Sequence, residues 1–341
     1  MLKVTNQEWL ELYEAASQFK KLKPWEWLSN VHLFGVRHPR GERTGYCCVM
    51  GSGGEVYGMA VYLGTEGLQT VLDMLNGDFE GDPLFAQHCY MLSFGSRDEL
   101  YPDEYERARE LGLSFRGKTA WPSFRLYEPG YVPWPLTNRE DVAFMTEILE
   151  QAMEVSLAYR QDPDALLEGN GERFLVRVPA AGEGAGTTEW ISEWREPDPA
   201  DRPLEPSGRA VIVDELRMAK ARRAVNGDAG IWEIDSFFIP MPIEEEERPF
   251  YPTMNVIADQ ETGQLLHYGL TKRSEASDSL ADGLLMLIES HRVIPQRVVA
   301  RHPRLLDELG LVLQGFGLES RIEPQLPAIE EFQQSVGGTL L

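Results

Sequence analysis

The sequence GIWEIDSFFIP, residues 230–240, decides the fold of the last third of the chain. Its apolar residues alternate with small or acidic ones, which is typical of a β-strand inside a sheet. Residues 250–271, FYPTMNVIADQETGQLLHYGLT, follow, and the segment DQETG within them is typical of a hairpin turn. Because short connections join these three strands, we expect them to be antiparallel neighbours.

Helices and strands alternate after residue 271. Strands that are separated by helices run parallel in a sheet. The sequence therefore predicts an α/β domain at residues 208–341, built on a mixed five-stranded sheet. The further elements are expected at residues 277–291 (helix), 296–301 (strand), 303–317 (helix), 318–324 (strand) and 326–336 (helix).

The first 160 residues predict a separate α+β domain. A capping box formed by Thr5 and Glu8 opens its first helix, and a long amphipathic helix is expected from about residue 138 to residue 159. Short apolar strands between these helices predict an antiparallel sheet. Residues 161–207 are set apart, because they read as a β-hairpin followed by a proline-rich acidic linker. The strands of the first domain are expected at residues 31–37, 46–51, 55–64 and 88–94.

Charge and cysteine content limit the classes of partner and compartment. The chain has 341 residues, with 32 Lys and Arg against 55 Asp and Glu, so its net charge is −23. This charge opposes binding to nucleic acid, whose affinity comes largely from cationic side chains, and favours a protein partner. Three cysteines, two of them adjacent, predict no disulfide scaffold and no zinc site. We expect a cytoplasmic protein without a membrane segment, and the sequence leaves its oligomeric state open.

Two resemblances add to this interpretation. The element order from residue 230 to residue 336 resembles the ribonuclease-H-like fold of the catalytic cores of retroviral integrases and transposases. Within it, Trp232-Glu233-Ile234-Asp235 resembles the Trp-x-x-Asp motif that carries the first catalytic aspartate in many of those enzymes. The segments PWEWL, GYCCVMG, YLGTEG and PGYVPW in the first 160 residues resemble a bacterial two-domain family of unknown function.

The resemblance to nucleases implies a metal site that this sequence does not complete. Such a core holds two divalent ions about 4 Å apart between carboxylates of the central strand, the adjacent fourth strand and the last helix. Asp235 fits the first position, and Glu330 or Glu331 fits the third. The second position should be an aspartate, but Ala300, Arg301 and His302 stand there instead.

Arg301 suggests what replaces the metal. Its guanidinium remains protonated at physiological pH. We hypothesise that Arg301 forms an ion pair with Asp235 or with Glu330 and Glu331, so that the acidic cluster persists without a metal. The alternative is that these charged side chains are solvated at the surface, where ion pairs contribute little stability.

Three functions follow from this pattern. The leading one is a non-catalytic binding or regulatory module with no cofactor, built on a degenerate ribonuclease-H-like fold. The alternative is a nuclease dependent on Mn or Mg, in which Asp235 and Glu331 are joined by Asp259 or His302 as a substitute ligand. Asp259 also has a simpler explanation as part of a hairpin turn. The third is an acidic accessory protein that mimics nucleic acid.

Aromatic residues gather between residues 121 and 134 and provide the other candidate surface. Together with interspersed prolines and basic residues, they resemble either a stacking platform or a loop packed over the sheet, and packing is the more common use of large rings. Gly51-Ser52-Gly53-Gly54 is interpreted as a hairpin turn, because a strand follows it where a phosphate-binding loop requires a helix. The candidate aromatic residues are Trp121, Phe124, Tyr127, Tyr131 and Trp134.

Overall fold

The computed structural model divides the chain into two compact units, Met1–Glu205 and Pro206–Leu341, which are considered separately below. It describes residues 3–41, 43–79, 81–166, 172–180, 189–199, 201, 211, 214–245 and 248–340. Residues 202–210, which include much of the expected proline-rich linker, thus lie outside the described residues.

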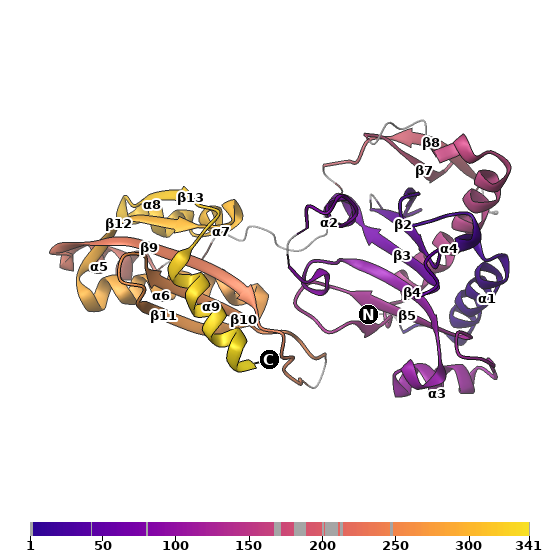
Figure 1. Ribbon diagram of the computed structural model, residues 1–341, viewed down its shortest axis with the longest axis horizontal. Coiled ribbons are helices and arrows are strands. Elements are labelled where there is room, and N and C mark those ends of the chain that lie inside the picture. Colours follow the sequence, from indigo (N-terminus) through magenta and orange to yellow (C-terminus); the bar gives the residue numbers. More distant parts are fainter. Residues whose placement is uncertain are drawn as a thin grey trace. The chain divides into compact units, whose positions relative to one another are not determined.

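Unit 1 contains an eight-stranded sheet with the order β6-β5-β4-β3-β2-β1-β7-β8 (Figure 1). Its strands are β1 (Phe34–Arg37), β2 (Thr44–Met50), β3 (Gly58–Leu63), β4 (Cys89–Gly95), β5 (Trp121–Tyr127), β6 (Trp134–Pro135), β7 (Phe174–Pro179) and β8 (Trp190–Arg195). Its α-helices are α1 (Asn6–Leu22), α2 (Gly64–Asn76), α3 (Pro102–Glu110) and α4 (Arg139–Gln161).

The expectation of an antiparallel sheet in this unit is wrong at one strand pair. β7 lies beside β1 and runs parallel to it, so the sheet is mixed. α4 connects β6, at one edge of the sheet, to β7, which pairs with β1 on the far side of the antiparallel strands. The hairpin of β7 and β8, which the sequence set apart from the first domain, therefore extends the first sheet.

The sheet of unit 1 is covered on both faces. On one face, α1 and α4 pack against alternate residues of the central strands, such as Cys47, Val49 and Val61. On the other, α2 packs near Cys48 and Tyr62. Because both faces are buried, β2 and β3 are apolar along most of their length, as is typical of an internal strand.

Unit 2 contains the expected mixed five-stranded sheet, with the order β11-β10-β9-β12-β13. The first three strands along the chain pair antiparallel, and β12 and β13 add in parallel. The strands are β9 (Gly227–Phe238), β10 (Thr253–Asp259), β11 (Leu265–Thr271), β12 (Val293–Ala300) and β13 (Glu319–Ile322). The helices are α5 (Glu215–Ala224), α6 (Ala276–His291), α7 (Pro303–Glu308), α8 (Gly310–Phe316) and α9 (Pro327–Leu340).

The two faces of the central strand β9 differ. Trp232 and Ile234 point into the apolar cluster that includes residues of α5, α6 and α8. Alternate residues face α9, which packs against β9 and β10 on the opposite side of the sheet (Figure 1). Glu233 and Asp235 lie on this α9 face. None of the described helices combines the length and the apolar character that crossing a membrane requires.

Candidate functional site

Asp235 lies on the central strand of unit 2 and is almost fully buried, with 2% of its surface exposed. It is paired with Val256 of β10 in the strand register. One carboxylate oxygen accepts a hydrogen bond from Ser236 N at 2.9 Å. Burial raises the pKa of Asp235 above its usual value, although this hydrogen bond and the charge of Arg301 act in the opposite direction.

Arg301 immediately follows β12 and lies between two acidic side chains. Its Nη1 is 3.7 Å from Asp235 Oδ2, and its Nη2 donates a hydrogen bond to Glu330 Oε1 at 3.2 Å. Glu330 stands in the first turn of α9, where its Oε1 also accepts a hydrogen bond from Leu326 N at 3.3 Å. One guanidinium thus links the central strand, the end of β12 and the start of α9.

Glu233 is a buried acid that the sequence analysis did not select. Its side chain is inaccessible to solvent, and its Oε2 accepts a hydrogen bond from Ile329 N at 3.0 Å, which caps the start of α9. Burial raises its pKa, whereas backbone hydrogen bonds from α9 lower it. Glu233 and Asp235 are two residues apart on one strand. This spacing was the signal in the sequence that both carboxylates lie on the same face of the sheet.

The remaining predicted ligands do not join Asp235 in a metal site. Asp259 Oδ1 accepts hydrogen bonds from Thr262 N and Thr262 Oγ1, both at 2.8 Å, and so closes the hairpin turn between β10 and β11. Glu331 Oε2 lies at the same turn, 3.8 Å from the position of a Cβ atom built on Gly263. His302 is close enough for its charge to lower the pKa of Asp235. Within the described residues, no three His, Cys, Asp or Glu side chains are grouped so that they could hold a metal ion.

The aromatic residues of unit 1 do not form one exposed surface. Phe124 is 3% exposed and packs edge-on against Tyr13 of α1, with ring centroids 5.3 Å apart. The ring centroids of Trp121 and Phe115 are 5.4 Å apart. Tyr127 packs with the apolar cluster on the α2 face of the sheet. Trp134 lies on β6, and Tyr131 lies in the segment between β5 and β6. Most of these rings therefore take part in packing.

A second acid–arginine pair joins β5 to α3. Glu104 of α3 is 2% exposed, and its Oε2 accepts a hydrogen bond from Arg125 Nη2 at 3.0 Å. The guanidinium also lies 4.5 Å above the ring of Tyr101, which is a cation–π contact. Beside it lies a cavity of about 40 Å³, whose lining includes Ser93 and Ser123. This volume is enough for a few water molecules.

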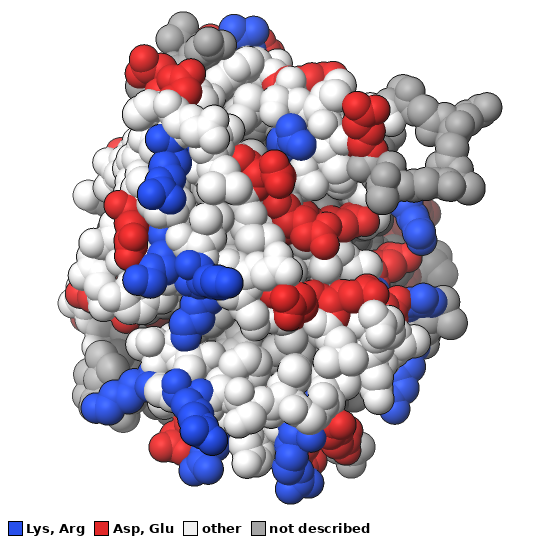
Figure 2. Space-filling model, turned by 90° about the vertical axis from the view of Figure 1, so that its right-hand side faces the viewer, with Lys and Arg blue, Asp and Glu red and all other residues white. Residues whose placement is uncertain are grey.

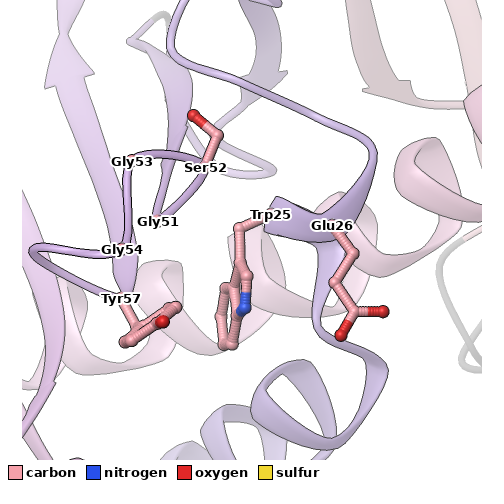
Figure 3. A pocket seen from close by; sticks show the side chains of 7 residues that line it. All are labelled: Trp25, Glu26, Gly51, Ser52, Gly53, Gly54 and Tyr57. Atoms are coloured by element: carbon pink, nitrogen blue, oxygen red, sulfur yellow. The ribbon is translucent and has the colours of Figure 1, made fainter.

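A larger hollow of about 450 Å³ lies between the turn that joins β2 to β3 and the short helix η1 (Pro24–Glu26). The rings of Trp25 and Tyr57 lie 5.2 Å apart at its floor, and Figure 3 shows the glycine-rich turn beside them. Gly51 has a φ of +132°, and a Cβ atom there would lie 2.8 Å from the Tyr57 ring, so the close approach requires glycine. The sequence predicted the turn but not the hollow, because Trp25 comes from a distant segment.

The three cysteines are free and buried in the sheet of unit 1. Cys47 faces α1 and α4, whereas Cys48 and Cys89 face α2. Burial raises the pKa of all three thiols, that of Cys48 to about 12. The three cysteines are therefore packed as small apolar side chains, and their environment does not favour the reactive thiolate form.

Acidic side chains also gather outside the sheet core. In Figure 2, which shows the side of unit 1 that carries α1, acidic side chains lie near the middle of the face and basic ones at its left and lower parts. On α4, burial and then the charge of Glu150 raise the pKa of Glu147 to about 7. The pKa of Glu150 is raised by burial and then by Glu11 of α1. Glu147 and Glu150 therefore repel each other within α4, and Glu150 and Glu11 repel each other between α4 and α1.

Two family models match the chain. Residues 9–177 match a domain of unknown function, DUF7309, and residues 217–337 match a second domain of unknown function, DUF6930. One match thus falls in each unit, and the first extends into β7, which pairs with β1 of the same unit. Neither a curated protein nor a solved structure matches the chain.

Proposed function

We propose that, in this chain of a DUF7309 and a DUF6930 domain, the second domain is a non-catalytic binding module in which Arg301 takes the place of a metal ion. The observation that carries the proposal is the position of the guanidinium, 3.7 Å from Asp235 and 3.2 Å from Glu330. The carboxylates that would clamp a divalent ion are thereby neutralised by a side chain.

The strand order supports the ribonuclease-H-like interpretation of this domain. The central strand β9 has antiparallel β10 on one side and parallel β12 on the other. Asp235 on β9, Arg301 at the end of β12 and Glu330 at the start of α9 occupy the three places that the resemblance assigns to metal ligands. Of these three residues, only Arg301 is positively charged, whereas a metal ligand at its position would be an acid.

Electrostatics explains why an arginine there opposes metal binding. Two unit charges 4 Å apart interact by about 4 kcal/mol at an effective dielectric constant near 20, and a divalent ion doubles that repulsion. Asp235 is buried, so solvent screens this interaction weakly. The same guanidinium stabilises the two acids that would otherwise repel each other. The acidic cluster is then a structural ion pair, and the net charge of −23 favours a protein over nucleic acid as the partner.

Calorimetric titration of the full chain with Mn²⁺ and Mg²⁺ tests the proposal. We expect no binding that depends on Asp235 in the wild-type chain. Arg301→Gln should gain Mn²⁺ binding, and the double variant Arg301→Gln/Asp235→Asn should lose it again. Arg297→Gln is the matched control, because Arg297 also belongs to β12 but pairs with Glu319 at 3.0 Å, away from Asp235. Micromolar Mn²⁺ binding by the wild-type chain that disappears in Asp235→Asn would overturn the proposal.

The nuclease alternative rests on one feature, the effect of a charge on His302, which lowers the pKa of Asp235. Its other proposed ligands, Asp259 and Glu331, lie at the β10–β11 turn. The same titration separates the two functions, and a cleavage assay with single- and double-stranded DNA and RNA in Mn²⁺ complements it. The alternative requires cleavage that is lost in Asp235→Asn and in His302→Ala, whereas the binding module requires none.

A further inference from the structure

The edge strand β11 of unit 2 is partly exposed, most of all at Tyr268 and Leu270. None of its seven residues is buried, in contrast to its neighbour β10. Tyr268 is 66% exposed and Leu270 is 55% exposed. Among the described residues β11 pairs with β10 on one side only, so the backbone N–H and C=O groups of its other side have no strand partner there. Such an edge is complementary to another extended strand.

The other sheet edges in the described residues are protected. β13 has four residues and carries Glu319 and Arg321, and β8 carries the ion pair of Glu193 with Arg195 at 2.7 Å. β6 has two residues and contains Pro135. Charges, proline and short length are the usual means by which proteins prevent strands from pairing at an edge. β11, with the sequence LLHYGLT, has no charge and no proline.

The regular part of β11 is complementary to itself. The register with β10 is regular from His267 to Thr271 and shifts at Leu265. If a two-fold axis passes through Gly269, antiparallel pairing places Tyr268 of each copy opposite Leu270 of the other. Both side chains lie on the same face of the strand, because they are two residues apart. An aromatic ring opposite an aliphatic side chain is a favourable cross-strand pair, and it forms twice.

We propose that β11 is the site at which two copies of this chain associate, by antiparallel pairing that joins their five-stranded sheets. Symmetry supports a second copy as the occupant, because a two-fold interface needs one patch that is complementary to itself. The neutral strand brings no like charges into opposition in this pairing. Because a single pair of strands forms the interface, we expect association to depend on concentration. This inference does not depend on the role proposed for Arg301.

The net charge gives the proposal a distinctive salt dependence. Each copy carries −23, so the two copies repel each other at a distance. Salt screens that repulsion but leaves the apolar and backbone contacts of the strand pair in place. Self-association at β11 is therefore stronger at high than at low ionic strength. A basic partner would show the opposite dependence.

Sedimentation velocity of the full chain over a wide concentration range, in low and in high salt, tests the proposal. We expect the wild-type chain to shift from monomer to dimer with concentration, and more so in high salt. Leu270→Lys should weaken association about tenfold or more, because it buries a charge opposite Tyr268 in each half of the pair. Leu311→Lys is the matched control, since Leu311 on α8 is 52% exposed and lies on no sheet edge. It should leave association unchanged.

Hydrogen exchange provides a second readout that does not depend on the variants. The backbone amides of residues 265–271 should become more protected as the concentration of the wild-type chain rises, and those of β13 should not. Equal effects of Leu270→Lys and Leu311→Lys, or protection elsewhere than β11, would overturn the proposal. A chain that stays monomeric in all conditions would also overturn it and would leave the edge to a strand of another protein.

Discussion

The two units each contain a buried acid beside a partly exposed arginine, and the two pairs differ in one respect. Glu104 and Arg125 of unit 1 are joined directly by a hydrogen bond of 3.0 Å. In unit 2, Arg301 Nη1 remains 3.7 Å from Asp235, and the hydrogen bond of the guanidinium goes to Glu330, whose side chain is 40% exposed.

This difference distinguishes a buried acid that is hydrogen-bonded to its arginine from one that is only close to it. In unit 1, the arginine donates a hydrogen bond to one oxygen of the buried carboxylate and stacks on Tyr101, so it joins α3 to β5. In unit 2, Arg301 neutralises Asp235 without a hydrogen bond to it. Without Arg301, Asp235 of β9 and Glu330 of α9 would lie near each other with no cation between them. The contact of Arg301 with Asp235 is therefore the looser of the two acid–arginine contacts.

The largest expected effect comes from removing each arginine in turn. Arg125→Met leaves Glu104 buried without its cationic partner and should lower the free energy of unfolding by about 3–5 kcal/mol. Arg301→Met removes one hydrogen bond to a partly exposed acid and should cost about 1–2 kcal/mol. Urea denaturation of both variants, followed by circular dichroism, measures the two values. Equal losses would contradict the distinction between the pairs.

A smaller effect tests whether the second buried acid of β9 has a structural role. Glu233→Ala removes the side chain that accepts a hydrogen bond from Ile329 N and should lower the free energy of unfolding by about 1–2 kcal/mol. Glu233→Gln keeps an acceptor oxygen and should recover much of that loss. The same denaturation experiment, with hydrogen exchange at the start of α9, measures both. If Glu233→Ala has no effect, α9 does not depend on this cap.

The smallest effect concerns an acid whose main charged neighbour is another acid. Burial and Glu150 raise the pKa of Glu147 in the folded chain to about 7, above its ordinary value of 4.5. Folding therefore favours the protonated form, and this stability is present below about pH 4.5 and is lost as the pH rises through about 7. Glu147→Gln cannot ionise, so it should raise the melting temperature at pH 8 and leave it nearly unchanged at pH 4.

The size of that change is limited because Glu147 remains partly in contact with solvent. We expect less than about 1 kcal/mol at pH 8. Thermal unfolding of the wild-type chain and of Glu147→Gln at the two pH values measures it. A destabilised Glu147→Gln at pH 8 would show that the carboxylate has a cationic partner that matters more than Glu150.

Local sequence patterns predicted unit 2 better than unit 1. The five strands of unit 2 were predicted in number and direction, because short turns and intervening helices determine which strands are antiparallel and which parallel. The pairing of β1 with β7 was not predicted, since the two strands are separated by almost the whole first domain and no local pattern indicates their contact. The expectation of an antiparallel sheet failed for that reason.

Prediction of the candidate site was limited in the same way, because contacts between distant segments leave no local pattern in the sequence. The resemblance led to the hypothesis that Arg301 pairs with Asp235 or with Glu330 and Glu331, and the guanidinium lies 3.7 Å from Asp235 and 3.2 Å from Glu330. The cap formed by Glu233 depends on the distance between β9 and α9, which residue spacing does not reveal. The hollow at Trp25 depends in the same way on two segments that meet only in the folded chain.

The placement of the three thiols has a practical consequence. Cys47, Cys48 and Cys89 all belong to one sheet, and each is inaccessible in the folded state. A brief pulse of an alkylating reagent will therefore mark only those molecules in which that sheet has opened. Unit 2 has no cysteine, so its own unfolding leaves no mark. Mass spectrometry of the pulsed samples can thus follow the opening of unit 1 separately from the unfolding of unit 2.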